Sequence, residues 1–191
     1  MRCVWRRLVR QFASLARRDG GAAAVEFALI LPIMIFIYVG CVEASALISM
    51  DRRVQTVSGT LGDLVARSDK TITSVTLTDY FRASAGVMTP YPSDDLEQIV
   101  TEVFVDSTGT AKVVWSREYK NELYAIGTDY VKDEVFPLPV EMKDIARNKW
   151  VIVAQASYDY LPLYGIVFEQ SVGLNRASFF MPRFGSSITV N

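Results

Sequence analysis

A long apolar segment near the N-terminus constrains this chain more than any other feature of its sequence. No side chain from Phe27 to Val42 is ionised, and the apolar character continues to Met50, interrupted by Glu43 and two serines. A helix needs about 20 mainly apolar residues to cross a bilayer, so this segment is long enough to span one. The sequence therefore predicts a membrane helix over residues 22–50.

Charged residues at the start of this segment indicate its orientation and point to a function. Six arginines precede it, at positions 2, 6, 7, 10, 17 and 18, and Glu26 lies in its first turns. Under the positive-inside rule these arginines hold the N-terminus in the cytoplasm, so the chain after the helix is expected outside. A carboxylate at the bilayer centre costs roughly 2.5–3.5 kcal/mol, and less toward the interface. We therefore expect Glu26 to have a partner or a function.

The order of residues at this boundary forms a recognisable motif. Gly20 and Gly21 follow the arginines, and the run Gly-Ala-Ala-Ala-Val-Glu-Phe at 21–27 leads into the apolar segment. A glycine followed by four residues and Glu-Phe, between a basic leader and an apolar helix, resembles the processing site of type IV prepilins of the Flp/Tad class. Within that class, residues 21–32 resemble the TadE-like pseudopilins of the tight-adherence pilus machinery.

Later parts of the chain resemble the same family. They are Asp-Leu-Val-Ala-Arg at 63–67, Pro-Tyr-Pro at 90–92, Val-Val-Trp-Ser at 113–116 and Pro-Arg at 182–183. Arg183 is a candidate for pairing with a carboxylate. The motif at 21–27 is the specific part of the resemblance, and the later segments are suggestive.

The resemblance implies roles for five residues. A prepilin peptidase would remove a leader of residues 1–21 by cutting between Gly21 and Ala22, reached through an extended Gly-Gly entry. Glu26 and Phe27 would form the processing and assembly motif, and Pro32 would kink the helix without ending it, as membrane helices tolerate.

The resemblance also implies a function. The chain would be a minor pseudopilin of Tad pilus biogenesis, with no enzymatic activity and no cofactor. Its partners would be the prepilin peptidase, membrane lipid, other Tad pilins or pseudopilins and the inner-membrane pilus platform. It would lie in the bacterial inner membrane with a single pass and a periplasmic C-terminal domain, and could enter the pilus itself.

The composition excludes several other functions. The chain contains no histidine, which rules out Ser-His-Asp and Cys-His catalysis and the histidine-based zinc motifs. Loss of residues 1–21 would leave 14 basic and 20 acidic side chains, so the mature chain would lack the positive surface that nucleic acids need. Both cysteines, Cys3 and Cys41, precede residue 51, so the exported part cannot form an internal disulfide.

Residues 51–191 are expected to form a periplasmic α+β domain. The apolar spacing extends the long helix to about Val65, with Gly59 and Gly62 weakening its end. A short helix is expected over 78–87 with Thr78 as N-cap. Strands are expected at 99–106, 111–116, 150–160 and 177–181, with a hairpin turn at 107–110 and a short helix after Pro139. The predicted fold is a pilin-like helix packed on an antiparallel sheet of three to five strands.

Two alternatives remain open at this stage. Ala44-Ser45-Ala46 matches an ordinary signal peptidase site, and a cut there would release a soluble domain starting near Leu47. Against it, the apolar run exceeds the 7–15 residues of a signal peptide, and Glu43 lies just before the cut. The other alternative is an uncleaved single-pass membrane protein that binds a small ligand or acts as a sensor. The mass of the mature chain separates all three.

Overall fold

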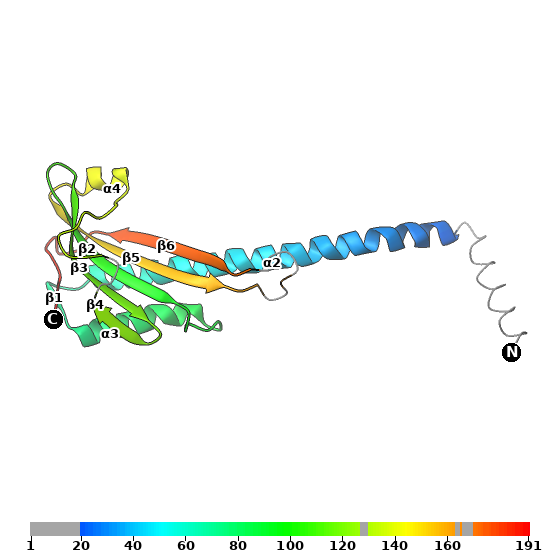
Figure 1. Ribbon diagram of the computed structural model, residues 1–191, viewed down its shortest axis with the longest axis horizontal. Helices are drawn as coiled ribbons and strands as arrows, with labels where there is room; N and C mark the ends of the chain where they lie inside the picture. Colours follow the sequence, from blue (N-terminus) through cyan, green and yellow to red (C-terminus); the bar gives the residue numbers. More distant parts are fainter. Residues whose placement is uncertain (1–19, 127–129, 163–164, 166–169) are drawn as a thin grey trace, which may run out of the picture.

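The molecule consists of one long helix whose far half belongs to a small α+β domain (Figure 1). The computed structural model describes residues 20–126, 130–162, 165 and 170–191. Nearly all of the predicted leader, residues 1–21, lies outside this part of the chain.

Helix α2 (Gly20–Ala66) has 47 residues and is continuous through Pro32. At 1.5 Å per residue it is about 70 Å long. Residues 23–38 are exposed along their whole length, whereas every turn from Met50 onward buries a side chain. The predicted continuation of the apolar helix beyond residue 50 is confirmed. The predicted domain boundary at residue 50 therefore falls within a continuous helix.

The domain contains a five-stranded antiparallel sheet in the order β4-β3-β2-β5-β6. Its strands are β2 (Glu97–Val105), β3 (Ala111–Lys120), β4 (Leu123–Ile126), β5 (Lys149–Tyr160) and β6 (Val172–Phe180). The expected strands at 99–106, 111–116 and 150–160 are confirmed, with small shifts at their ends. The turn at 107–110 joins β2 to β3, and Asp106 and Thr110 close it with a backbone hydrogen bond of 3.0 Å. The predicted α+β class is confirmed.

Three expected details were wrong or missing. Helix α3 (Ser74–Ala85) begins earlier than predicted, because the Thr73 hydroxyl caps it by accepting the Thr76 N–H at 3.1 Å. Thr78, the predicted cap, lies inside the helix and donates its hydroxyl to the Ser74 carbonyl. Strand β6 begins at residue 172 and not at 177, and the short strand β4 was not predicted.

The remaining elements are short. They are β1 (Thr71–Ile72), the 3₁₀ turn η1 (Gly86–Met88), α4 (Val140–Ile145) and β7 (Thr189–Val190). Helix α4 confirms the short helix expected after Pro139.

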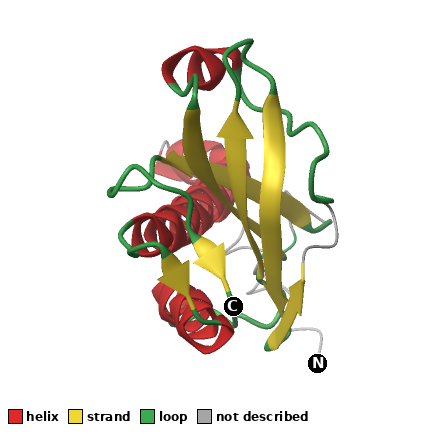
Figure 2. Ribbon diagram, turned by 90° about the vertical axis from the view of Figure 1, so that its left-hand side faces the viewer, coloured by secondary structure: helices red, strands yellow, loops and turns green. Residues whose placement is uncertain are grey.

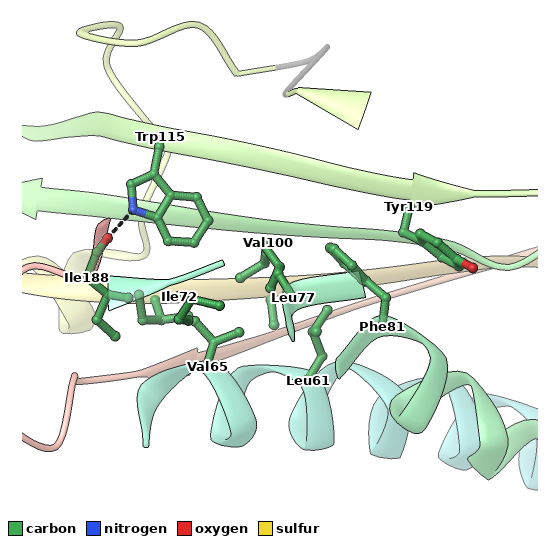
Figure 3. Close-up of a cluster of buried hydrophobic side chains, with 11 residues drawn as sticks. Leu61, Val65, Ile72, Leu77, Phe81, Val100, Trp115, Tyr119 and Ile188 are labelled. Carbon is green, nitrogen blue, oxygen red and sulfur yellow. Dashed lines mark hydrogen bonds between the residues drawn. The ribbon is translucent and has the colours of Figure 1, made fainter. Parts of the chain in front are cut away.

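Helices α2 and α3 lie side by side on one face of the sheet (Figure 2). Between them and the strands lies the main core, in which Leu61 and Val65 of α2 and Phe81 of α3 meet Val100 and Trp115 of the sheet (Figure 3). A smaller cluster covers part of the opposite face, where Phe136, Leu138 and Ala146 pack on Val103, Val151 and Val153. These clusters bury apolar positions on both sheet faces, whereas Leu123 and Ile126 of the edge strand β4 are exposed.

At Gly62 the backbone of α2 comes close to the sheet. A Cβ atom at this position would lie 2.5 Å from Cδ2 of Phe180 on β6 and 3.2 Å from Cβ of Ala154 on β5. A glycine weakens an isolated helix, as the sequence suggested. Here its missing side chain instead lets the helix backbone approach the sheet.

The C-terminal segment ties the end of α2 to the sheet. Strand β7 pairs in parallel with β1, and the buried carboxylate of Glu102 on β2 accepts hydrogen bonds from the Ile188 N–H and the Ser187 hydroxyl, both at 2.8 Å. The Trp115 indole N–H donates to the Ile188 carbonyl at 2.6 Å (Figure 3). Burial raises the pKa of the Glu102 carboxyl, and these donors only partly oppose that rise.

Gly62→Ala is expected to lower the free energy of unfolding by about 1–2 kcal/mol, because the added methyl group overlaps the Phe180 ring. Gly59→Ala is the matched control, since its Cβ would meet only the Ser178 hydroxyl at 3.9 Å. The control should be neutral or stabilising by up to about 1 kcal/mol. Urea denaturation of the detergent-solubilised chain measures both, and equal effects would contradict the close approach.

Glu102→Gln tests the buried carboxylate. Because the pKa of Glu102 is raised in the folded state, its contribution to stability falls as the pH rises from about 4.5 through its folded pKa. Glutamine keeps one acceptor and cannot ionise. The unfolding free energy of the variant, relative to the unaltered chain, should therefore increase with pH over this window. Urea denaturation followed by tryptophan fluorescence at several pH values checks this, and a pH-independent difference would refute it.

Candidate functional site

The five residues predicted to carry function all lie near the start of α2. The helix begins at Gly20, so the bond between Gly21 and Ala22 lies in its first turn and not in the extended entry that was expected. The first four N–H groups of a helix have no acceptor within it, so this turn is the part of α2 most easily opened. Glu26 and Phe27 follow in the next turn, and Pro32 lies further along.

The first half of α2 presents an uncovered apolar surface. Residues 23–38 are all exposed, and the large apolar side chains among them are Val25, Phe27, Leu29, Ile30, Leu31, Ile33, Met34, Ile35, Phe36, Ile37 and Tyr38. A soluble monomer rarely exposes so much contiguous apolar surface. The helix is also long and apolar enough to cross a membrane. This half of α2 therefore requires lipid or other helices around it.

Glu26 is the one side chain of residues 23–38 that is charged at neutral pH. It forms no ion pair within the part of the chain that the structure describes. Residues four apart lie on one face of a helix, so Ala22, Glu26 and Ile30 share a face at successive turns. A charge on Ala22 would lie about 6 Å from Glu26 along the axis, at four residues of 1.5 Å rise.

The second half of α2 is fixed to the domain by apolar and polar contacts. Met50, Val54 and Val57 pack in one cluster with Tyr158 and Tyr160 of β5. Asp51 pairs with Arg176 of β6 at 2.6 Å. The Arg53 guanidinium also donates to the carbonyls of Val87 and Thr89 at 2.9 and 2.8 Å. The domain therefore contacts the second half of α2 along its length, and the exposed half continues from this fixed part of the helix.

The segments 63–67 and 182–183, which are distant in the sequence, meet at the C-terminal end of α2. Asp63 forms ion pairs with Arg67 at 2.5 Å and with Arg183 at 2.8 Å, and the Arg183 N–H donates to the Ala66 carbonyl. The hydrogen bond from Arg67, helped by that from Arg183, holds the pKa of Asp63 below its usual value against a partial desolvation. The expected pairing of Arg183 with a carboxylate is confirmed, and its partner is Asp63.

The domain shows little that suggests chemistry. The adjacent acidic pairs Asp94-Asp95 and Asp133-Glu134 are exposed to solvent and lie outside the helices and strands. Across the described ranges, no three Cys, Asp or Glu side chains lie close enough together to hold a metal ion. A hollow of about 260 Å³ lies between α3 and the turn after β3, where Arg82 donates to the Tyr119 hydroxyl at 3.2 Å. Sequence patterns gave no sign of this hollow.

Comparison with known proteins shows that the N-terminal region is similar to one family. Residues 21–59 match the family described as TadE-like protein. The match begins at the glycine of the predicted cleavage motif and ends where α2 packs on the sheet. Over these residues the chain is similar to TadE-like proteins, the family that its N-terminal motif predicted. No curated protein and no solved structure matches the chain.

Proposed function

We propose that this chain is a minor pseudopilin that a prepilin peptidase cuts between Gly21 and Ala22. The mature chain then joins the Tad pilus machinery through the exposed half of α2. One observation carries the proposal: the family match starts at Gly21 and runs into a helix whose residues 23–38 have an uncovered apolar surface. Such a surface suits insertion in a bilayer first and packing against other pilin helices afterwards.

The cleavage step follows from the position of Gly21. Glycine has no side chain, so a protease can approach the backbone closely at this residue. The bond lies in the first turn of α2, where unpaired N–H groups make local opening inexpensive. The arginines of the leader keep this end at the cytoplasmic face, and the domain is then periplasmic.

The assembly step uses Glu26. After the cut, Ala22 carries a new α-amine, and in assembled helices the amine of one subunit meets Glu26 of its neighbour. Two unit charges about 4 Å apart attract by roughly 4 kcal/mol at an effective dielectric constant near 20. This attraction offsets much of the cost of holding a carboxylate in an apolar surrounding.

Two observations bear on the alternative functions. A signal peptidase cut after Ala46 would fall inside continuous α2, at residues that pack against the domain core, which counts against a secreted soluble domain. An uncleaved membrane sensor keeps the leader, so its mass exceeds that of the mature pseudopilin by residues 1–21.

Gly21→Leu should block processing, because the leucine side chain obstructs access to the scissile bond. The precursor should accumulate in membranes at its full mass, as measured by mass spectrometry after co-expression with the cognate peptidase. Gly40→Leu makes the same substitution outside the motif and should be processed normally. Normal processing of Gly21→Leu, or a mature N-terminus near Leu47, would contradict the proposal.

Glu26→Gln should separate assembly from processing. The variant keeps the shape of the side chain and removes its charge, so the chain should be inserted and cut but should not crosslink to partner pilins. Cells carrying it should have few pili. Glu26→Asp keeps the charge and should retain much of the crosslinking. If Glu26→Gln crosslinks and supports pili like the unaltered chain, the ion-pair step is wrong while the family assignment stands.

A further inference from the structure

A hollow beside the end of α3 plays no part in the proposed pilus function. Its volume is about 260 Å³. One water molecule occupies about 30 Å³ of liquid, so the hollow has room for several waters or for one small organic molecule. Leu96, Gln98 and Tyr119 form its floor, and all three are buried. The Gln98 side chain accepts a hydrogen bond from the Ser84 hydroxyl at 2.6 Å and donates one to the Phe81 carbonyl at 3.2 Å, so this floor is fixed.

One wall of the hollow is fixed by a contact with α2. Thr89 and Tyr91 line this wall. The Arg53 guanidinium of α2 donates to the carbonyls of Val87 and Thr89, and it lies 5.4 Å from the centre of the Tyr91 ring. A hollow whose floor and wall are both held by the fold is preformed, as small-molecule sites usually are.

A positive charge is held at the rim of the hollow. Arg82 of α3 lines the hollow and donates its Nε–H to the Tyr119 hydroxyl at 3.2 Å. The Tyr119 ring stacks on Phe81, with ring centres 5.3 Å apart (Figure 3). Within the described part of the chain, Arg82 forms no ion pair. Its terminal N–H groups are therefore available to a carboxylate, which a guanidinium binds through two parallel hydrogen bonds.

Negative charges lie at the same rim. Glu122 and Asp94 are exposed and line the hollow. The hydrogen bond to Tyr119 raises the pKa of Arg82, and the charges of Glu122 and Asp79 raise it further. Of these two acidic residues, Glu122 lines the hollow and Asp79 does not. Arg82 and Glu122 are thus close enough to interact without forming an ion pair.

The fold keeps these two charges apart. The Tyr119 hydroxyl fixes the guanidinium of Arg82. Glu122 belongs to the two-residue turn that joins β3 to β4, in which Asn121 has φ 51° and Glu122 has φ 61°. Glycine adopts a positive φ without strain, whereas a residue such as glutamate rarely does. A small ligand that carries both charges can bridge the gap, with its carboxylate at Arg82 and its ammonium group at Glu122.

We propose that the hollow between α3 and the β3–β4 turn binds a free α-amino acid, whose carboxylate pairs with Arg82 and whose ammonium group pairs with Glu122 and Asp94. An α-amino acid carries both charges on adjacent groups. A simple carboxylate would meet two acidic side chains at the rim, and a simple amine would leave the terminal N–H groups of Arg82 without an acceptor. The inference uses only residues of the domain and the helix packed on it, so it stands or falls separately from the pilus function.

The test measures ligand binding to the full chain in phosphatidylcholine nanodiscs by saturation-transfer NMR, with saturation confined to aromatic protons, which the lipid lacks. L-leucine is the probe, because Leu96 and Ala85 line the hollow and can contact its side chain. N-acetyl-L-leucine lacks the ammonium group, and L-leucine methyl ester lacks the carboxylate. Saturable binding of L-leucine is expected. Both analogues should bind about tenfold more weakly or worse, because each loses one charged hydrogen-bonded pair.

Variants connect this binding to the hollow. Arg82→Gln and Glu122→Gln should each weaken L-leucine binding by about tenfold. Arg52→Gln, at an exposed arginine of α2 that does not line the hollow, is the matched control and should bind like the unaltered chain. Glu122→Gln also separates binding from folding, because Glu122 is exposed and the change leaves the Arg82–Tyr119 hydrogen bond in place.

Absence of saturable L-leucine binding would overturn the proposal. Equal binding of the methyl ester would assign the hollow to cations, and equal binding of N-acetyl-L-leucine would assign it to carboxylates. Either result rejects the amino-acid site. Unchanged binding in both Arg82→Gln and Glu122→Gln would reject it as well, because the ligand would then lie elsewhere on the chain.

Discussion

The close packing of α2 on β5 and β6 is the constraint on which the rest of the structure depends. Apart from Glu26, the helix is apolar all round over residues 23–38, and it then presents one face to the sheet over its last turns. Gly62 permits a close approach, with Phe180 occupying the space that a side chain would fill. Because α2 covers β5 and β6, the last two strands of the five-stranded sheet in chain order, residues more than 110 positions apart meet across this interface. The core between α2 and the sheet is complete only when β6 packs on the helix.

The C-terminal segment closes the structure after that return. Arg183 reaches the end of α2, and the last strand adds to β1 directly after the helix. The carboxylate of Glu102 on β2 accepts two hydrogen bonds from this segment and fixes it to the sheet. Burying a carboxylate costs free energy, and the raised pKa of Glu102 reflects that cost. Its donors come from the segment it holds, so the carboxylate is satisfied only when the chain end is in place.

The sequence predicted those parts of the fold that rest on local patterns. The long helix, the β2–β3 hairpin and β5 follow from apolar spacing and turn residues that any short window contains. Strand β4 was missed because it has four residues and follows a turn made by Asn121 and Glu122, both with positive φ and neither of them glycine. The start of β6 was missed because Gly173 and Asn175 interrupt the pattern, and its pairing with β5 compensates.

The functional residues also fall into two groups, those that a local sequence motif identifies and those that depend on the fold. Gly21, Ala22, Glu26, Phe27 and Pro32 form one local run, so a motif was sufficient to find them. Gly62 and the Asp63–Arg183 pair depend on neighbours brought by the fold, and sequence alone assigned Gly62 only a weakening of the helix end. The expected kink at Pro32 does not end the helix, since α2 continues on both sides of it.

The absence of a linker between the two halves of α2 has a mechanical consequence. A pull on the exposed half acts along the helix axis, and about 30 Å of helix from residue 46 to Ala66 lies against the sheet in the same direction. Such a load shears the whole interface at once, so many contacts resist together and none is peeled off first. Any axial movement of the helix therefore displaces the domain by the same distance, and the subunit transmits force as a single rod.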